Sequence, residues 1–287
     1  MSLWARIMGK EGHDVDELAR RLDVDADHLR AVRPQYTEFT IPKRSGGTRR
    51  ILAPGSELKA VQRRILRRLL ERLGVHPAAT GFQKGHSIVT NALFHAGKAV
   101  VVHMDIRDFF GTTRTKRVST YFRKVGWNRE AASLLTALCC HDGGLPQGAP
   151  TSPRLSNLVN YRLDARLTGL AGTAGALYSR YADDMTFSFD RDDHDAVEHA
   201  IWKTKRILAD EGYKLHTHKK LHIRRRHQRQ IVTGLVVNER VHLPRETRRW
   251  LRAVEHHAAT GQPTTLSPEQ LAGWRALRLM IDAQRQA

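Results

Sequence analysis

Two adjacent carboxylates, Asp183 and Asp184, interrupt a stretch whose flanking residues, 177–181 and 185–189, alternate with the two-residue period of β-strands. The sequence therefore predicts a β-hairpin with both aspartates in its tight turn. Two like charges there repel and raise each other's pKa unless a cation neutralises them. Oxygen ligands of this kind suit Mg²⁺. Taken alone, the pair fits a solvated turn at least as well.

A third carboxylate, Asp105, follows a near-continuous apolar run over residues 99–104. Such a run is typical of a strand that is buried on both faces. If folding brings the ends of these strands together, three carboxylates can hold two Mg²⁺ ions for in-line displacement at phosphorus. One ion would activate a 3′-hydroxyl, and the other would stabilise a pyrophosphate leaving group.

A loop rich in Gly and Pro, residues 143–150, lies between these carboxylates in the sequence. Its composition excludes regular structure through Pro150. Thr151 or Ser152 is expected to cap a helix with Pro153 in its first turn. A glycine loop before a helix lets a phosphate or a base approach the backbone closely. The loop also fits simple chain punctuation.

The order of these segments resembles the reverse transcriptases, and within them the retron type, over roughly residues 36 to 287. Two strings, Asn-Ala-x-x-His and Val-Thr-Gly, are features that retron enzymes carry beyond the general set. The resemblance rests on the segments at 41–54, 81–87 and 91–95, the Asp105 strand, Leu145-Pro146-Gln147-Gly148, Tyr181-Ala182-Asp183-Asp184, Lys219-Lys220 and Ile231-Val232-Thr233-Gly234-Leu235.

The resemblance implies an α+β fold, the right-hand polymerase, whose palm is an antiparallel sheet with helices. The expected parts are an N-terminal helical extension over residues 1–35, fingers over 36–98, a palm over 99–240 and a short helical thumb over 241–287. The N-terminal helices form a helix-turn-helix-like hairpin, which fits a packing extension better than a DNA reader.

The resemblance also implies a catalytic centre. Asp105, Asp183 and Asp184 would bind two Mg²⁺ ions, with Mn²⁺ as a substitute, and the backbone carbonyl of Ile106 would be an extra ligand. A lysine of the 219–220 pair would protonate or neutralise the leaving pyrophosphate. The count from Gly212 favours Lys220 over Lys219, although His216 stands where the family usually has Asn.

Further residues are expected to bind the incoming dNTP. Lys43 and Arg49 would contact the triphosphate, because cationic groups neutralise the charge that develops on it. Phe110 would stack under the sugar and exclude a 2′-hydroxyl, unless it only packs in the core, a role that also suits its neighbour Phe109. Gln147 and Gly148 would contact the nascent base pair or the template.

The retron-type strings suggest recognition of a structured RNA and initiation from an internal 2′-hydroxyl. The residues concerned are Asn91, His95, Val232, Thr233 and Gly234. A structural alternative stays open for His95, which could simply cap or brace the helix expected over residues 88–95.

Composition agrees with a nucleic-acid partner. The 287 residues include 48 Lys and Arg against 29 Asp and Glu, a formal charge of +19. Such an excess indicates a polyanionic partner.

Cys139 and Cys140 are adjacent, so an ordinary disulfide between them is excluded, and buried free thiols in a reducing bacterial cytoplasm are expected. The sequence contains no apolar stretch long enough to span a membrane, and no signal sequence is recognised.

The expected function is synthesis of a small DNA (msDNA) on a structured non-coding RNA by an RNA-directed DNA polymerase, in antiphage defence, with an effector protein as a candidate partner. Two alternatives stay open. One is another bacterial reverse transcriptase, of the abortive-infection or diversity-generating type. The other is a non-catalytic nucleic-acid-binding module of a defence system, against which the three intact aspartates argue.

Overall fold

The computed structural model describes residues 12–43, 46–216 and 221–284. These residues form two compact units. Unit 1 comprises the described parts of Met1–Pro77, Arg107–Ala165 and Ala209–Tyr213, and unit 2 comprises those of Ala78–Ile106, Arg166–Leu208 and Lys214–Ala287. The chain crosses between the units several times, so neither is a single continuous segment. The predicted borders of fingers, palm and thumb stay predictions.

Unit 1 is mainly helical and carries one antiparallel hairpin, in which β1 (Tyr36–Pro42) pairs with β2 (Thr48–Pro54). Its helices have apolar residues at three- and four-residue spacing, and these faces pack into one core. α4, for example, buries Leu58, Val61 and Ile65 and exposes its arginines. The helices are α2 (Val15–Leu22), α3 (Ala26–Ala31), α4 (Ser56–Arg68), the 3₁₀ turn η1 (Leu70–Arg72), α6 (Phe109–Thr112), α7 (Thr115–Lys124), α8 (Arg129–Cys139) and α9 (Ser152–Val159).

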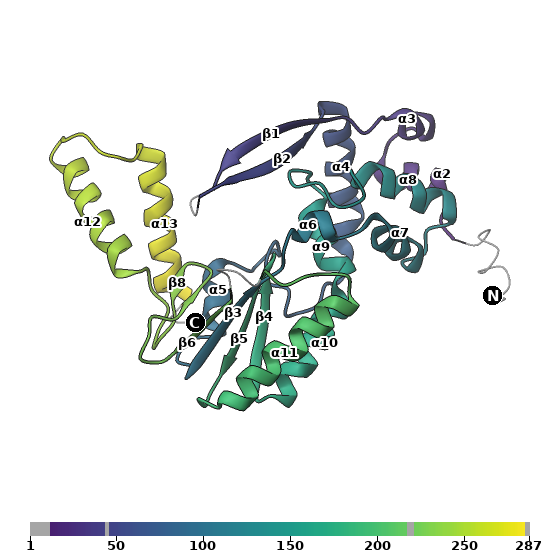
Figure 1. Ribbon diagram of the computed structural model, residues 1–287. Coiled ribbons are helices and arrows are strands. Elements are labelled where there is room, and N and C mark those ends of the chain that lie inside the picture. The colour runs from purple at the N-terminus through teal and green to yellow at the C-terminus, as the bar shows by residue number, and fades with distance from the viewer. Residues whose placement is uncertain (1–11, 44–45, 217–220, 285–287) are drawn as a thin grey trace. The chain divides into compact units, whose positions relative to one another are not determined.

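Unit 2 is built on a four-stranded antiparallel sheet in the order β4-β5-β3-β6 (Figure 1). The strands are β3 (Val100–Asp105), β4 (Ala176–Tyr181), β5 (Asp184–Phe189) and β6 (His222–Arg225). One face of the sheet is apolar and is covered by α11 (His194–Asp210) and by the adjoining part of α10 (Tyr161–Thr173), as Figure 1 shows. Both faces of β3 and β5 are largely buried, as the apolar run before Asp105 predicts.

The remaining elements of unit 2 pack around a second core. They are α5 (Ile88–Leu93), the small hairpin of β7 (Ile231–Val232) and β8 (Leu235–Val236), and two long helices, α12 (Arg245–Ala259) and α13 (Pro268–Gln284). Val89 and Ala92 of α5 meet Val232 and Leu235 of the hairpin in this core. Leu251 of α12 and Ile281 of α13 belong to the same core, so the two long helices share it with the hairpin that carries the Val-Thr-Gly string.

The two N-terminal helices, the Asp105 strand, the aspartate hairpin and the two C-terminal helices form as predicted. Thr151 occupies the N-cap position of α9 and Pro153 lies in the first turn, as predicted, but the Thr151 side chain makes no capping bond. The other candidate, Ser152, does not cap the helix, because its hydroxyl donates to the carbonyl of Pro146 at 2.7 Å. The aspartate turn is also tighter than expected, since Asp184 is already the first residue of β5.

Two further predictions concern the cysteines and membrane-spanning helices. Cys139 and Cys140 are buried and unpaired, and burial raises the pKa of the Cys140 thiol to about 11. Across the described ranges, none of the helices combines the length and the apolar character that a bilayer crossing requires.

Candidate active site

Two of the three aspartates face each other across neighbouring strands. Asp105 ends β3 and Asp184 begins β5, and the antiparallel register makes these two residues direct partners. Asp183 lies beside them in the turn, where its carbonyl accepts the N–H of Ile106 at 3.0 Å. Paired residues of an antiparallel sheet have Cα atoms about 4.5–5.5 Å apart. Strand register thus brings the three aspartates to the same end of the two central strands.

The turn that carries Asp183 is held from two sides. Ala182 has a left-handed backbone, φ 59°, as a two-residue hairpin turn requires. Arg180, whose side chain is fully buried, donates from Nη1 to the Ala182 carbonyl at 2.9 Å. On the other side Gly81 lies so close that a Cβ there would be 2.7 Å from the Ala182 nitrogen. Gly81 is therefore required by contact with the turn.

The segment before Gly81 extends the sheet alongside β4. The Arg180 N–H donates to the Ala78 carbonyl at 2.7 Å, and the Thr80 N–H donates to the Arg180 carbonyl at 2.9 Å. These bonds fix residues 78–81 against the last residues of β4, immediately before the turn that carries Asp183. The motif at 81–87 thus starts from a rigid position next to Asp183.

The donor set fits a hard divalent cation, because carboxylate oxygens are the ligands that Mg²⁺ and related ions prefer. Asp105 is 3 % exposed, whereas the Asp184 side chain is 39 % exposed and lies 3.4 Å from Nε2 of His103. Within the described ranges, no three His, Cys, Asp or Glu side chains already converge as a ready-made metal cluster. The backbone thus brings three candidate ligand residues to neighbouring positions, where their side chains do not form a metal cluster.

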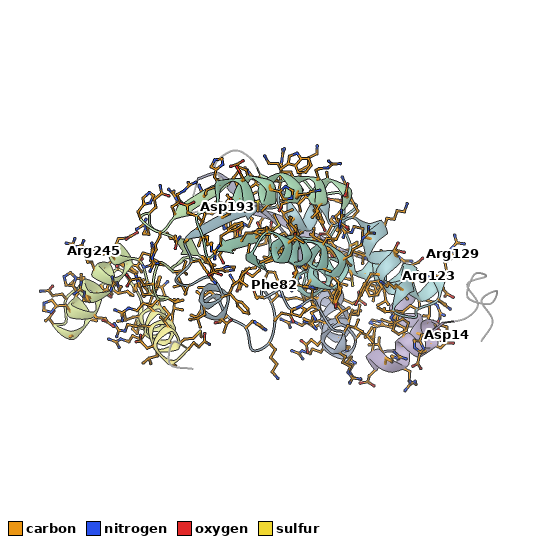
Figure 2. All side chains as sticks on the ribbon, turned by 90° about the horizontal axis from the view of Figure 1, so that it is seen from below. Asp14, Phe82, Arg123, Arg129, Asp193 and Arg245 are labelled. Atoms are coloured by element: carbon orange, nitrogen blue, oxygen red, sulfur yellow. The ribbon has the colours of Figure 1, made fainter. Side chains whose placement is uncertain are left out.

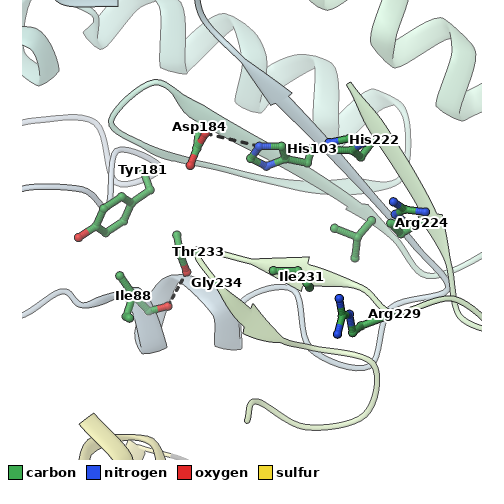
Figure 3. Close-up of a pocket in the computed structure, with 11 residues that line it drawn as sticks. Ile88, His103, Tyr181, Asp184, His222, Arg224, Arg229, Ile231, Thr233 and Gly234 are labelled. Carbon is green, nitrogen blue, oxygen red and sulfur yellow. Dashed lines mark hydrogen bonds and ion pairs between the residues drawn. The ribbon is translucent and has the colours of Figure 1, made fainter. Parts of the chain in front are cut away.

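A pocket of about 760 Å³ opens beside Asp184 (Figure 3). Its sheet wall is basic and aromatic, and the rings of His103 and His222 stack there with centroids 6.3 Å apart. The opposite wall comes from the small hairpin and α5 (Figure 3). The lining residues are Ile88, Val101, His103, Tyr181, Asp184, His222, Arg224, Arg229, Ile231, Thr233 and Gly234.

The Val-Thr-Gly string forms the tip of the β7–β8 hairpin. Val232 is buried in the core, while Thr233 (φ 46°) and Gly234 (φ 83°) make the turn. The Thr233 hydroxyl donates to the carbonyl of Ile88 at 2.8 Å, which ties the turn to the start of α5 (Figure 3). Thr233 and Gly234 line the pocket, and Val232 anchors the hairpin in the core of unit 2.

Asn91 and His95 lie in a buried hydrogen-bond network. Oδ1 of Asn91 accepts from the hydroxyls of Thr80 at 2.7 Å and Ser179 at 2.8 Å. Because Ser179 gives its single proton to Asn91, its oxygen accepts from Nε2 of His95 at 2.8 Å. Nδ1 of His95 is then unprotonated and accepts from the Ser188 hydroxyl at 2.7 Å. The network joins the α5 segment to β4 and β5.

This burial has a consequence for the retron-type string. Asn91 and His95 are 1 % and 0 % exposed. Desolvation lowers the pKa of His95 to about 3, with a smaller contribution from Lys98, so the imidazole is neutral. Both side chains are engaged inside unit 2, which favours the bracing alternative over direct contact with RNA. Recognition of RNA by these two residues stays a prediction.

The residues expected to bind the triphosphate lie on the hairpin of unit 1. Lys43 and Arg49 are exposed, the former at the end of β1 and the latter in β2 opposite Ile41. The neighbouring Arg50 has another role. Its guanidinium pairs with Glu38 and with Asp142, at 2.7 and 3.1 Å. Arg50 thus ties the hairpin to the loop before Gly143.

The Gln147-Gly148 step is fixed to the same hairpin. The Leu52 N–H donates to the Gln147 carbonyl at 2.8 Å. A Cβ on Gly148 would lie 2.6 Å from the Leu52 oxygen, and φ at this residue is 133°. Only glycine therefore allows this contact. The loop and the hairpin that carries Arg49 form one bonded structure within unit 1.

Phe110 and Phe109 differ in burial. Phe109 is 3 % exposed and its ring lies 5.9 Å from that of Tyr213, so Phe109 is the core residue of the pair. Phe110 is partly buried, and its carbonyl accepts the N–H of Leu145 at 3.1 Å. Phe110 is thus anchored by its backbone to the Leu-Pro-Gln-Gly loop, with part of its side chain accessible. Lys219 and Lys220 lie outside the described residues.

Comparison with known proteins decides the family. The model of the family "Reverse transcriptase (RNA-dependent DNA polymerase)" matches residues 41–233. The chain is a reverse transcriptase family member. It is 37% identical to the retron Ec86 reverse transcriptase of Escherichia coli over 253 residues, which cover 87% of this chain and 78% of that protein. This relative places the chain within the retron type.

Two Myxococcus xanthus enzymes are similar over much of this chain. Identity is 39% to the retron Mx162 reverse transcriptase and 38% to the retron Mx65 enzyme, over 86% and 87% of this chain. The chain spans 58% and 62% of the length of these two relatives. Family membership implies dependence on a divalent cation.

Solved structures show the same fold. Telomerase from Candida albicans, in complex with a fragment of telomeric RNA, superposes with a TM-score of 0.54 at 10% identity, over 79% of this chain and 48% of that one. Truncated apo telomerase from Candida tropicalis gives 0.52 at 13% identity, over 75% and 56%. The predicted right-hand polymerase fold is confirmed.

Proposed function

We propose that this chain is an RNA-directed DNA polymerase of the retron type, which makes a small DNA on a structured non-coding RNA. The observation that carries the proposal is the register of β3 and β5, which sets Asp105 opposite Asp184 with Asp183 in the adjoining turn. Three carboxylates at the ends of paired strands are what a nucleotidyl transfer with divalent cations requires.

Asp105, Asp183 and Asp184 would hold two Mg²⁺ ions, which supply activation of the attacking hydroxyl and stabilisation of the pyrophosphate charge. The Ile106 carbonyl is a further candidate ligand. Arg180 and Gly81 keep the backbone of the turn in place, so that cation binding requires only the carboxylate side chains to converge. Mn²⁺ is expected to replace Mg²⁺, because it accepts the same oxygen ligands.

In unit 1, Lys43 and Arg49 would bind the triphosphate by charge-assisted hydrogen bonds. Phe110 would lie under the sugar and exclude a 2′-hydroxyl, which selects dNTPs. Gln147 and Gly148 would meet the nascent pair or the template, and Lys220 or Lys219 would neutralise the leaving pyrophosphate. The exposure of Lys43 and Arg49 and the fixed Gly148 backbone support these roles.

The retron type is supported by the identity to retron enzymes and by the two strings at Asn91 and Val232. The partner would be a structured RNA, joined to the DNA product. Thr233 and Gly234, which line the pocket beside Asp184, are better placed than Asn91 or His95 to touch it. A protein effector, a role in antiphage defence and a cytoplasmic location remain predictions from the sequence.

The test is primer extension on an RNA template with Mg²⁺. The double variant Asp183→Asn, Asp184→Asn keeps the side-chain shape but removes the charge that holds the cations, so extension is expected to disappear. The control is an unchanged melting temperature. Extension that survives in the double variant would exclude this site. Sequencing of co-purified nucleic acid tests the retron type, since branched RNA–DNA is expected.

A further inference from the structure

Phe82 follows Gly81 and has a left-handed backbone, with φ 61°. An aromatic L-residue rarely adopts this conformation, because its Cβ approaches the backbone too closely. Such strain persists where the surrounding structure imposes it, and it gathers at functional sites. The surroundings that impose it here are the bonds of residues 78–81 to β4 and the tight contact of Gly81 with Ala182.

Burial of the Phe82 side chain does not offset this strain. Phe82 is 44% exposed (Figure 2). Its ring lies 6.3 Å from the ring of Tyr181, at an interplanar angle of 41°. Tyr181 is the residue before the catalytic turn and also lines the pocket that contains Asp184. Two aromatic rings thus lie side by side at the edge of the catalytic carboxylates.

We infer that Phe82 is a stacking residue for the terminal nucleotide of the primer strand. An accessible aromatic ring binds a base or a ribose through its face, without regard to sequence. The strand end must reach Asp105 and Asp184 to react, and Tyr181 joins that position to Phe82. The bonds along residues 78–81 fix the ring beside the reacting end before the nucleic acid arrives. The inference rests on the proposed polymerase function.

The experiment measures binding in the absence of dNTPs, so that it is independent of catalysis. The full-length chain is titrated with a DNA primer annealed to an RNA template, and the dissociation constant is compared among variants. Phe82→Ala should weaken binding about 5- to 150-fold, which is the usual range for loss of one base–aromatic stack. Phe94→Ala is the matched control, because Phe94 is a 53% exposed phenylalanine at the end of α5.

A second variant separates function from stability. Glycine adopts φ 61° without strain, so Phe82→Gly should weaken binding like Phe82→Ala while its melting temperature is equal to or above that of the wild type. A structural role predicts the opposite, a lower melting temperature together with weaker binding. Unchanged binding by both variants would also overturn the inference.

A photocrosslink identifies the strand. A primer with 5-iodo-2′-deoxyuridine at its 3′ end should crosslink to the peptide that contains Phe82, whereas the same base at the opposing template position should not. A crosslink from the template alone would overturn the assignment to the primer. Binding and crosslinking without any primer extension by the wild-type chain would instead contradict the proposed function and leave the contact intact.

Discussion

The neutral, buried state of His95 predicts how stability depends on pH. In the folded chain the imidazole pKa is about 3, against an ordinary value of 6.5, so between these values the unfolded chain binds a proton that the folded chain does not. The contribution of the neutral His95 to the free energy of unfolding is therefore fully present above about pH 6.5. It is lost progressively as the pH decreases toward 3. Replacing His95 with Gln, which does not titrate, should remove this contribution.

The size of the effect follows from the shift. Each pH unit between the two pKa values changes the free energy of unfolding by about 1.4 kcal/mol. From pH 8 to pH 5 the titration of His95 should therefore lower the stability by about 2 kcal/mol. At pH 8, His95→Gln should itself be destabilised by about 1–3 kcal/mol, because Gln can keep at most one of the two buried hydrogen bonds that His95 makes to Ser179 and Ser188.

Urea denaturation at pH 8, 7, 6 and 5 tests this directly. Between pH 8 and pH 5 the unfolding free energy of the wild type should fall by about 2 kcal/mol more than that of His95→Gln. His194→Gln, at an exposed histidine that begins α11, is the control and should follow the wild type. A difference between the wild type and His95→Gln that stays constant with pH would show that His95 is not held neutral.

Four further predictions concern the proposed reaction. Phe110→Ala should raise the ratio of kcat/KM for rNTPs to that for dNTPs about 10- to 100-fold, and an unchanged ratio would place the gate elsewhere. Arg49→Ala should raise KM for dNTPs about tenfold or more. The control is Arg50→Ala, which loses only exposed ion pairs and should therefore change the melting temperature little. Its effect on KM should be smaller than that of Arg49→Ala. Gly148→Ala should cost about 1–3 kcal/mol in stability and reduce extension, as measured by urea denaturation and primer extension, because its Cβ would meet the Leu52 oxygen at 2.6 Å. Thr233→Ala should reduce initiation on the structured RNA more than extension of an annealed primer, and equal loss on both would indicate a purely structural role.

The meeting of the strand ends that carry Asp105 and Asp184 could be predicted, because it depends on short-range patterns. The apolar run before Asp105 and the alternation around Asp183 each specify a strand and where it ends. An antiparallel pairing of two such strands then leaves little choice but to bring the ends together. The amphipathic helices were predictable for the same reason, since the spacing of their apolar residues selects one buried face.

The bracing network could not be predicted in this way. Asn91 and His95 are polar residues on a short helix segment, and the local pattern does not indicate that both are buried. Their partners, Thr80, Ser179 and Ser188, lie on other segments and are recognisable only after the sheet has formed. In the sequence, the network is indicated by Ser179 and Ser188, because each places a hydroxyl within a strand whose other residues are mainly apolar or aromatic.

Backbone strain adds information that neither periodicity nor motifs contain. Among the described residues with positive φ that are neither glycine nor aspartate, all three belong to unit 2: Phe82, Ala182 and Thr233. Aspartate tolerates this conformation and these three residue types do not. Ala182 lies in the turn that carries Asp183, Thr233 lines the pocket beside Asp184, and Phe82 contacts Tyr181, which lines it too. Local preference is thus overridden around one site, as expected where geometry is selected for function.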